Sequence, residues 1–286
     1  MHILLTGASG FLGRHINAEL LARGHTVQPV SRRLGHDLLN LTRPVDWLPL
    51  LDKVDAVINA AGIIGEEGAQ TFDAIHTDAP TALFTACVQA GVARVVQISA
   101  LGADEQAFSA FHLSKRAADD VLRASSLQWM VLRPALVYGA GGRSARLFMN
   151  LSRLSVIPVL DGGLQPVQPV HVSDVAAAVL ASMSTSEPRQ TIDVVGPEIM
   201  TLGDWLHAMR RAQGRPPAHL LNVPLALAQC AIGLGGLFSP LACPDNLRML
   251  RTGYTAKPDK LTTLLGRPPL RASSERILST LCGSLT

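Results

Sequence analysis

An N-terminal strand that runs directly into three glycines constrains the fold of this chain most. Residues 3–6 are apolar up to a threonine, and Gly7, Gly10 and Gly13 follow with the spacing G-x-x-G-x-x-G. So sharp a turn into a helix needs backbone without Cβ, and the free N–H groups at the helix start attract phosphate. A tight turn that binds nothing is the alternative. We predict dinucleotide binding by the residues of this segment, Gly7, Ala8, Ser9, Gly10, Phe11, Leu12 and Gly13.

Short apolar runs alternate with helical patterns through the first two thirds of the chain. This alternation is typical of βαβ units and predicts an α/β fold with a Rossmann-type doubly wound parallel sheet. A proline at position 29 suits a weakly paired strand, because proline cannot donate to a ladder. We expect strands at 3–6, 26–30, 34–39 (short or weak), 55–61, 93–99, 129–132, 167–172 and 191–195. The helices expected between them cover 12–23, 72–90, 114–124 and 175–183.

The pattern predicts two domains of unequal size in the 286 residues. Residues 1–195 should form the NAD(P)-binding domain, with an excursion near 138–166 toward the smaller domain. Residues 196–286, where helical stripes are separated by proline pairs, should form a smaller, mostly helical domain on the substrate side. An apolar content of 48% is sufficient to bury a core in such a chain.

Charge and cysteine content narrow the partners and the compartment. The net charge of +3 is too small to predict nucleic-acid binding, but it is uneven, with −2 over residues 1–195 and +5 over residues 196–286. The basic C-terminal part could meet an anionic substrate, a partner or a membrane surface, or could be a solvated face. Four scattered cysteines suit a reducing compartment, and no basic segment precedes the first strand. We therefore expect a cytoplasmic protein, peripheral to the inner face of a membrane in the alternative case.

One uncharged stretch, residues 225–243, approaches the length that spans a bilayer. It contains a glutamine, a proline and three glycines, which favour a broken helix packed within the smaller domain. A shallow contact with a membrane interface is the alternative.

The end of the second strand indicates which dinucleotide is preferred. An NAD site places a carboxylate here for the ribose 2′-hydroxyl, about 20 residues past the glycines. This chain has Ser31, Arg32 and Arg33 and no acid. Because a guanidinium binds a 2′-phosphate with charge-assisted hydrogen bonds, we predict NADP over NAD. Solvated arginines are the alternative.

Five segments carry a resemblance to a known family: 6–13, 59–62, 96–103, 132–139 and 168–176. In content and order they resemble the extended and atypical short-chain dehydrogenase/reductases, most closely the branch with the Rossmann-fold accessory subunit of respiratory complex I and its bacterial relatives. The resemblance is specific through about residue 200 and looser beyond it. It implies NAD(P) binding, oxidoreductase activity, and a contact with a respiratory complex as one kind of partnership.

The resemblance also implies roles for single residues. Asp37 and Leu38 would lie by the adenine, and the turn formed by Asn59, Ala60, Ala61 and Gly62 under the adenine ribose. Ser99 would end the strand beside the nicotinamide, and Lys115 would hold the nicotinamide ribose. The residues that would flank the nicotinamide ring are Pro134 and Val137.

The expected proton donor is missing from the catalytic helix. In active members of the family a tyrosine four residues before the lysine is the general acid or base, and here Phe111 occupies that position. Ser99 is followed by Ala100, so the partner hydroxyl is also missing. Lys115 and Ser99 remain as candidate catalytic residues. Among substitutes, His112 titrates near neutrality but is rotated about 100° from position 111 on a helix. The acidic residues show no spacing that predicts a metal site.

Three functions follow in order of preference. The first is an NADP-dependent oxidoreductase of the atypical branch, acting on an unidentified small molecule that is apolar or quinone-like. The second is a non-catalytic dinucleotide-binding protein, either a redox sensor or an assembly or accessory protein of a respiratory complex. The third is a sugar-nucleotide epimerase or dehydratase, which also needs the tyrosine that Phe111 replaces.

Overall fold

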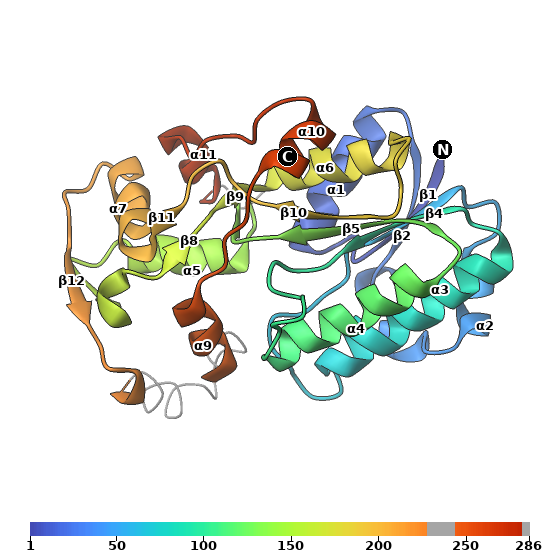
Figure 1. Cartoon of the computed structure of the whole chain (residues 1–286), viewed down its shortest axis with the longest axis horizontal. Helices are drawn as coiled ribbons and strands as arrows, with labels where there is room; N and C mark the ends of the chain where they lie inside the picture. The colour runs from blue at the N-terminus through green and yellow to red at the C-terminus, as the bar shows by residue number, and fades with distance from the viewer. Residues whose placement is uncertain (228–243, 282–286) are drawn as a thin grey trace. The chain divides into compact units, whose positions relative to one another are not determined.

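The computed structural model describes residues 1–227 and 244–281, and its largest element is a six-stranded parallel sheet (Figure 1). The strands are β1 (His2–Thr6), β2 (Thr26–Val30), β3 (Ala56–Asn59), β4 (Arg94–Ile98), β5 (Gln128–Pro134) and β10 (Gln190–Val194). They are arranged in the order β10-β5-β4-β3-β1-β2, and every neighbouring pair is parallel. The order reverses between β1 and β3, which is where ligands bind in open α/β sheets. The predicted doubly wound α/β fold is confirmed.

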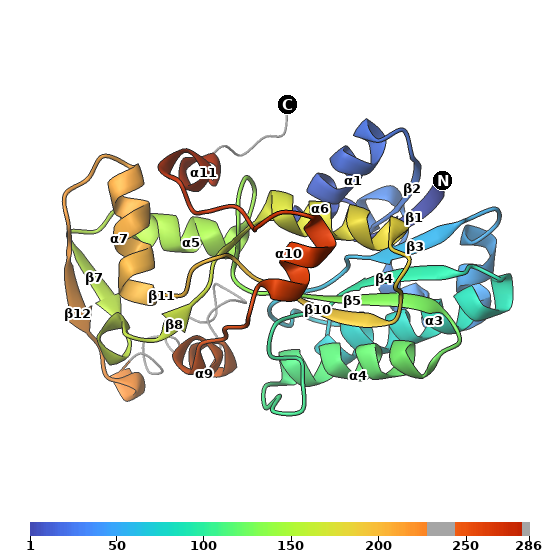
Figure 2. The same cartoon turned by 45° about the horizontal axis from the view of Figure 1, so that its top comes forward.

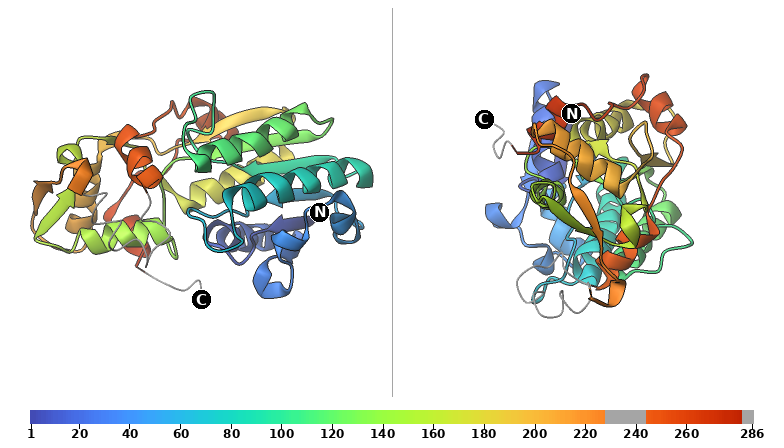
Figure 3. Two further views of the ribbon diagram at one scale, coloured as in Figure 1. Left: turned by 90° about the horizontal axis from the view of Figure 1, so that it is seen from below. Right: turned by 90° about the vertical axis from the view of Figure 1, so that its left-hand side faces the viewer.

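Helices cover both faces of this sheet, as parallel strands require (Figures 1 and 2). One face carries α1 (Phe11–Ala22), α6 (Val172–Ser184) and α10 (Asp259–Leu265). On the other face, α3 (Ala79–Ala90) and α4 (Ala110–Ala124) lie side by side, and the short α2 (Pro44–Trp47) packs against α3 (Figure 3). The core on that side contains Trp47, Leu83, Phe84, Leu122 and Val131.

Among the residues that the structure describes, β2 forms the edge of the sheet and pairs with β1 alone. This edge position explains how the strand accommodates Pro29. The expected third strand at 34–39 is wrong, because the chain forms two 3₁₀ turns there, η1 (Arg32–Leu34) and η2 (Leu38–Asn40). Gly35 between them is left-handed, with a φ of 87°, and such a residue cannot continue a strand.

The helix expected at 72–90 has two parts. It begins with a π-helical segment, η4 (Asp73–Asp78), and continues as α3. The wider turn of a π-helix reorients the side chains around it, and such segments are frequent at functional sites. The following helix, α4, begins four residues before the expected residue 114, because the Ser109 hydroxyl caps it by accepting from His112 N at 3.2 Å.

Three two-stranded sheets and several helices make up the remaining part of the described chain. β6 (Val137–Tyr138) pairs with β9 (Val170–His171), β7 (Val156–Val159) with β12 (His219–Asn222), and β8 (Pro166–Val167) with β11 (Met200–Thr201). The helices are α5 (Arg143–Leu151), α7 (Leu202–Ala212), α9 (Pro244–Thr252) and α11 (Ser274–Ser279). The core around α5 and α7 includes Tyr138 and Trp205. Residues 167–172 were expected in the central sheet, which is wrong. Val167 ends β8, residues 170–171 form β9, and Val172 begins α6. Pro169 separates the two short strands, because proline cannot donate to a ladder.

Contacts between Cα atoms divide the chain into two compact units that alternate along it. The first comprises Met1–Pro134, Ser173–Val194 and Asp259–Arg267. The second comprises Ala135–Val172, Val195–Pro258 and Pro268–Thr286. One of these boundaries lies between Val194 and Val195; the first unit also takes up α10, and the second takes up residues 135–172.

The uncharged stretch 225–243 lies outside the described residues except for its first three positions. Within 1–227 and 244–281, no helix combines the length and the apolar character needed to cross a membrane.

Candidate functional site

The glycine turn joins β1 to α1 at the point where the strand order reverses. Gly7 is left-handed, with a φ of 65°, and a Cβ there would lie 2.7 Å from the carbonyl oxygen of Ala60. Gly10 N donates to Gly7 O at 2.8 Å and closes the turn. A Cβ on Gly13 would lie 2.1 Å from Gly7 O, so only glycine lets α1 start this close to the turn. Arg14 then fastens the turn from the helix side, donating to Ser9 O at 2.9 Å.

The start of α1 fits a phosphate group. Gly10 is the N-cap residue and brings no side-chain cap, so the first-turn N–H groups at Phe11, Leu12 and Gly13 have no intrahelical acceptor. The first turn also carries no acidic side chain that would repel an anion. Gly10 is exposed at this helix start, and Phe11 and Leu12 are half-buried. The start of α1 therefore offers the kind of free N–H donors that bind a pyrophosphate.

The end of β2 presents a buried hydroxyl beside two exposed arginines. Ser31 is 7% exposed, and its Oγ has no hydrogen-bond partner within the described part of the chain. Arg32 and Arg33 follow in η1 and are exposed. A buried hydroxyl without a partner is costly, and a phosphate oxygen would satisfy it. Beyond these residues Asp37 caps η2 by accepting from Leu39 N at 3.1 Å, and Leu38 is half-buried in η2.

The end of β3 is held by a polar network that crosses three strands. Asn59 accepts from the Thr6 hydroxyl and donates to Gln97 Oε1 at 2.7 Å, and all three side chains are buried. Ala61 N donates to Thr6 Oγ1 at 3.3 Å. Asn59 thus ties β1, β3 and β4 together below the turn, while the backbone of the following residues faces the glycine turn.

Lys115 lies at the end of this network on α4. Its Nζ donates to Ile98 O at 3.1 Å and to Ala61 O at 3.3 Å, and the residue is 5% exposed. A Cβ on Gly62 would lie 3.0 Å from this nitrogen, so the turn after β3 passes directly over the ammonium group. Burial lowers the pKa of Lys115, and the charge of Asp119 opposes that shift.

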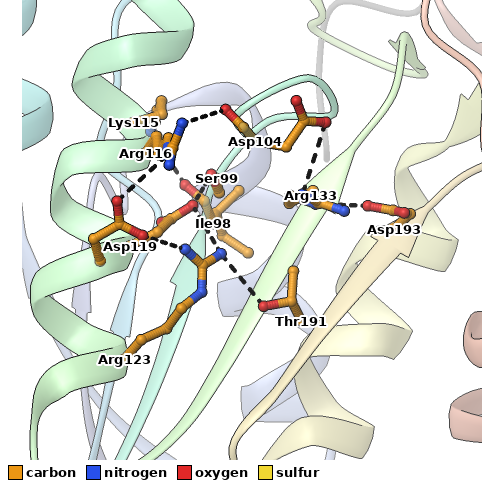
Figure 4. A network of polar contacts seen from close by, with 11 residues as sticks. Ile98, Ser99, Asp104, Lys115, Arg116, Asp119, Arg123, Arg133, Thr191 and Asp193 are labelled. Atoms are coloured by element: carbon orange, nitrogen blue, oxygen red, sulfur yellow. Dashed lines mark hydrogen bonds and ion pairs between the residues drawn. The ribbon is translucent and has the colours of Figure 1, made fainter. Parts of the chain in front are cut away.

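Asp119 is a buried carboxylate one helical turn after Lys115 (Figure 4). The Ser99 hydroxyl donates to Asp119 Oδ2 at 2.5 Å, and Arg123 lies 3.9 Å from the same oxygen. Burial raises the pKa of Asp119, while the hydrogen bond from Ser99 and the charges of Arg123 and Lys115 hold it down. Sequence reasoning counted Asp119 among the acidic residues that show no metal-site spacing and missed this contact. Its spacing of four residues from Lys115 is the signal that could have revealed it.

Aromatic rings and a buried histidine surround position 111. Phe111 packs edge-on against Phe72 and His76, with ring centroids 5.9 and 5.5 Å apart. His76, on η4, accepts from Ile63 N through Nε2 at 3.0 Å, so its Nδ1 carries the proton and donates to Ser114 Oγ at 3.0 Å. Burial first, and then the charge of Lys115, lowers the pKa of His76 well below its usual range. Sequence reasoning missed His76, which lies far from Lys115 along the chain.

His112 does not reach the place of the missing phenol. It is 2% exposed, its Nδ1 lies 3.1 Å from Ser109 Oγ, and burial lowers its pKa to about 4. It therefore fastens the start of α4 as a neutral imidazole. Of the two residues expected to flank the nicotinamide, Pro134 ends β5 and accepts from Leu101 N at 2.9 Å, whereas Val137 lies in the second unit on β6.

The first unit thus brings together most of the predicted site residues. The glycine turn, Ser31, the 59–62 turn, Ser99 and Lys115 all lie at or next to the carboxyl ends of β1 to β4. This edge is where the doubly wound fold places its ligands.

Comparison with known proteins gives a matching family. A profile described as the NAD dependent epimerase/dehydratase family matches residues 3–196. A ceramide reductase of Caulobacter vibrioides is 32% identical over 195 residues, 64% of this chain and 61% of that protein. The mitochondrial NADH dehydrogenase (ubiquinone) 1 alpha subcomplex subunit 9 of Arabidopsis thaliana is 28% identical over 247 residues, 79% of this chain and 61% of that protein. The chain spans about three fifths of the length of these two relatives.

A third relative and two solved structures extend the comparison. Photosystem II assembly factor Ycf39 of Synechocystis is 27% identical over 247 residues, 79% of this chain and 72% of that protein. MoeE5 in complex with UDP-glucose and NAD superposes with a TM-score of 0.75 at 21% identity, covering 98% of this chain and 97% of that one. UDP-glucuronic acid 4-epimerase of Bacillus cereus superposes with a TM-score of 0.74 at 19% identity, covering 99% and 98%. At these identities the structures show a shared fold.

Proposed function

Because the chain belongs to the NAD dependent epimerase/dehydratase family, we propose that it binds a nicotinamide dinucleotide at the carboxyl edge of the central sheet and acts as an NADP-dependent oxidoreductase. The observation that carries this proposal is the glycine turn, in which a Cβ on Gly7 or Gly13 would collide with backbone atoms and α1 begins without a side-chain cap on its first N–H groups. When bound, such a cofactor donates or accepts a hydride. The predicted family resemblance is confirmed by the match over residues 3–196.

The chain's own residues would divide the work of binding. The N–H groups of the glycine turn would hold the pyrophosphate, and the ammonium group of Lys115 would hold the nicotinamide ribose. Phe111 packs with Phe72 and His76 at the start of α4, and its own ring offers no proton. A substrate of this site would therefore take its proton from water or need none from the protein.

The preference for NADP rests on the end of β2. Ser31 offers a buried hydroxyl without a partner in the described chain, and Arg32 and Arg33 offer two exposed cations. A charge-assisted phosphate contact contributes roughly 1.5–3 kcal/mol, which is about ten-fold or more in affinity. We expect NADPH to bind at least about ten-fold more tightly than NADH.

Calorimetric titration with both cofactors tests this preference. Arg32→Ala should remove most of it, whereas Arg23→Ala, an exposed arginine at the far end of α1, should leave it unchanged. Equal affinities, or tighter binding of NADH by the unchanged protein, would refute the assignment of NADP.

We propose a small apolar or quinone-like carbonyl compound as the substrate. The name of the ceramide reductase, the relative with 32% identity, supports reduction of an apolar molecule. Residues 196–286, the smaller domain of the predicted division, would shape the pocket. The cytoplasm, or the inner face of a membrane in the alternative case, is the compartment we propose.

A non-catalytic role is the second candidate, and Phe111 is the observation that favours it. The names of two relatives, a respiratory-complex subunit and a photosystem assembly factor, support the association of such a protein with a larger complex. Oxidation of NADPH in the presence of long-chain ketones or quinones separates the two candidates. Turnover supports the reductase, and tight NADPH binding without turnover across both substrate classes supports the accessory role. A sugar-nucleotide epimerase is less favoured, since Phe111 cannot exchange the proton that its chemistry requires.

A further inference from the structure

Two opposite charges are buried on one face of α4. Lys115 is 5% exposed and Asp119 is fully buried, and their spacing of four residues places them one above the other on the helix. Side chains of these types are almost never buried unless they are paired or have a function. Along α4, Asp119 is the acid whose charge raises the pKa of Lys115, while Arg123, 3.9 Å from Asp119 Oδ2, is a second cation beside the carboxylate.

The two side chains bind neighbouring residues, Ile98 and Ser99, at the end of β4. Lys115 Nζ donates to the carbonyl oxygen of Ile98, and the next residue, Ser99, donates its hydroxyl proton to Asp119 (Figure 4). The acceptors of Lys115, Ile98 O and Ala61 O, are both neutral. The hydrogen bonds of the ammonium group therefore bring it no negative charge, and the charge of Asp119 acts on it without a direct hydrogen bond.

Only one of the two carboxylate oxygens of Asp119 accepts a hydrogen bond within the described part of the chain. Its Oδ2 has the Ser99 bond and lies 3.9 Å from Arg123, but Oδ1 is buried without a hydrogen-bond partner among the described residues. The Gln97 amide lies close enough to lower the pKa of the carboxyl, although its Nε2 does not meet hydrogen-bond geometry. A carboxylate oxygen buried without a hydrogen bond is costly, and this cost asks for a role beyond the bond to Ser99.

Few other charges act on this pair from the elements packed around it. From η4, His76 is neutral, since burial and Lys115 lower its pKa. From α3, the buried Cys87 thiol is neutral, since burial raises its pKa to about 12. From β5, Arg133 is engaged with Asp193 at 2.6 Å, and within α4 Arg123 also pairs with Asp120 at 2.7 Å.

Stability does not account for the pair. The pKa of Lys115 is lowered and that of Asp119 is raised, so burial disfavours both charged forms more than their mutual attraction favours them. A lowered lysine pKa and a raised carboxyl pKa both mean that the charged pair costs stability near neutral pH. Charged side chains that are buried at a cost in stability occur mainly at functional sites.

We propose that Asp119 is the counter-ion that keeps Lys115 protonated, and is thereby a positioning residue for the ribose-binding cation of the nicotinamide dinucleotide site. The proposal rests on the proposed function for its biological meaning, but the electrostatic coupling is measurable without any cofactor. The competing explanation is that Asp119 only ties β4 to α4 through Ser99.

The sequence contains four lysines, so the ammonium group of Lys115 can be followed by NMR in protein labelled with ¹³C-lysine. Loss of one signal in Lys115→Arg assigns the resonance. Asp119→Asn keeps the shape of the side chain and removes its charge, and the midpoint of the Lys115 titration should fall by at least about 1 pH unit. Asp120→Asn, the exposed neighbouring acid, should leave the midpoint unchanged. Ser99→Ala, which removes the tie but keeps the carboxylate, should shift it much less than Asp119→Asn.

An unchanged Lys115 midpoint in Asp119→Asn would overturn the proposal, and so would equal shifts in Asp119→Asn and Ser99→Ala. If Asp119→Asn does not fold, the unchanged protein decides the question. Its Lys115 resonance should show a second, smaller step where Asp119 ionises, and a single-step titration would contradict the pairing.

Titration with NADPH at several pH values separates this inference from the proposed function. In Asp119→Asn the affinity should begin to fall at a lower pH than in Asp120→Asn, by the same interval as the Lys115 midpoint. A shifted midpoint in a protein that does not bind NADPH would leave the ion pair standing and refute the proposed function. NADPH binding by a protein whose Lys115 midpoint is not shifted in Asp119→Asn would support the proposed function and refute the ion pair.

Discussion

Gly13 is the position where a single methyl group should most damage the first βαβ unit. A Cβ there would lie 2.1 Å from Gly7 O and 2.8 Å from the Cα of Ala8, and both are backbone atoms that cannot rotate away. Gly10, three residues earlier, offers a matched comparison, because a Cβ there would meet only Gly7 O, at 3.0 Å. We predict that Gly13→Ala destabilises the fold and that Gly10→Ala largely spares it.

The magnitude follows from how far α1 would have to move. Relief of a 2.1 Å contact to an ordinary distance requires a displacement of about 1 Å, and α1 also buries Ile16 and Leu20. Overpacking of this kind costs about 3 kcal/mol, and the better helix propensity of alanine returns about 1 kcal/mol. The net loss for Gly13→Ala is about 2 kcal/mol. Alanine in place of glycine at the N-cap should cost less than about 1 kcal/mol.

Urea denaturation followed by circular dichroism measures both values. Titration with NADPH completes the test, because Gly10→Ala should lose cofactor affinity in a protein that is still folded, the methyl group standing where the phosphate approaches. A Gly13→Ala protein as stable as the unchanged one would refute the reasoning, since it would mean that the helix start can move from the turn at no cost.

Two further predictions concern α4. His112 is held neutral in the folded protein, with a pKa of about 4. Between about pH 6.5 and pH 4 the unfolded chain therefore binds a proton that the native imidazole does not, and the free energy of unfolding decreases as the pH is lowered. Urea denaturation at pH 7 and pH 5 should show that His112→Asn avoids about 2 kcal/mol of the loss seen in the unchanged protein; an equal loss in both would contradict a neutral His112. Phe111→Tyr should introduce weak NADPH-dependent ketone reduction, because Lys115 lies one helical turn away, with a gain of at most about 10² given the alanine at position 100. NADPH absorbance measures this gain, Phe108→Tyr is the control, and equal rates in the two variants would show that position 111 does not face the reacting group.

Local sequence predicted the parts of this protein that depend on backbone chemistry alone. The glycine spacing predicted the turn between β1 and α1, since a left-handed residue and two close approaches leave no choice of side chain. Alternating apolar runs predicted the parallel sheet, whose inner strands β1, β3 and β4 are buried along nearly their whole length. Pro29 indicated that the strand at 26–30 is weakly paired. It is weakly paired because β2 is the edge strand of the sheet, and not because a short strand at 34–39 lies beside it. The strand expected at 34–39 failed because Gly35 ends extended structure locally, a signal that was present but outweighed by the expected topology.

Contacts between distant segments were decided by the tertiary structure alone. His76 and Ser114 meet only because η4 packs against α4, and nothing in either segment indicates the other. The spacing of Lys115 and Asp119 was visible in the sequence, but the same spacing on a solvated helix would be an ordinary surface pair worth a few tenths of a kcal/mol. Packing against β4 removes water from both charges, and that desolvation turns a common helical spacing into a coupled pair at the end of the sheet.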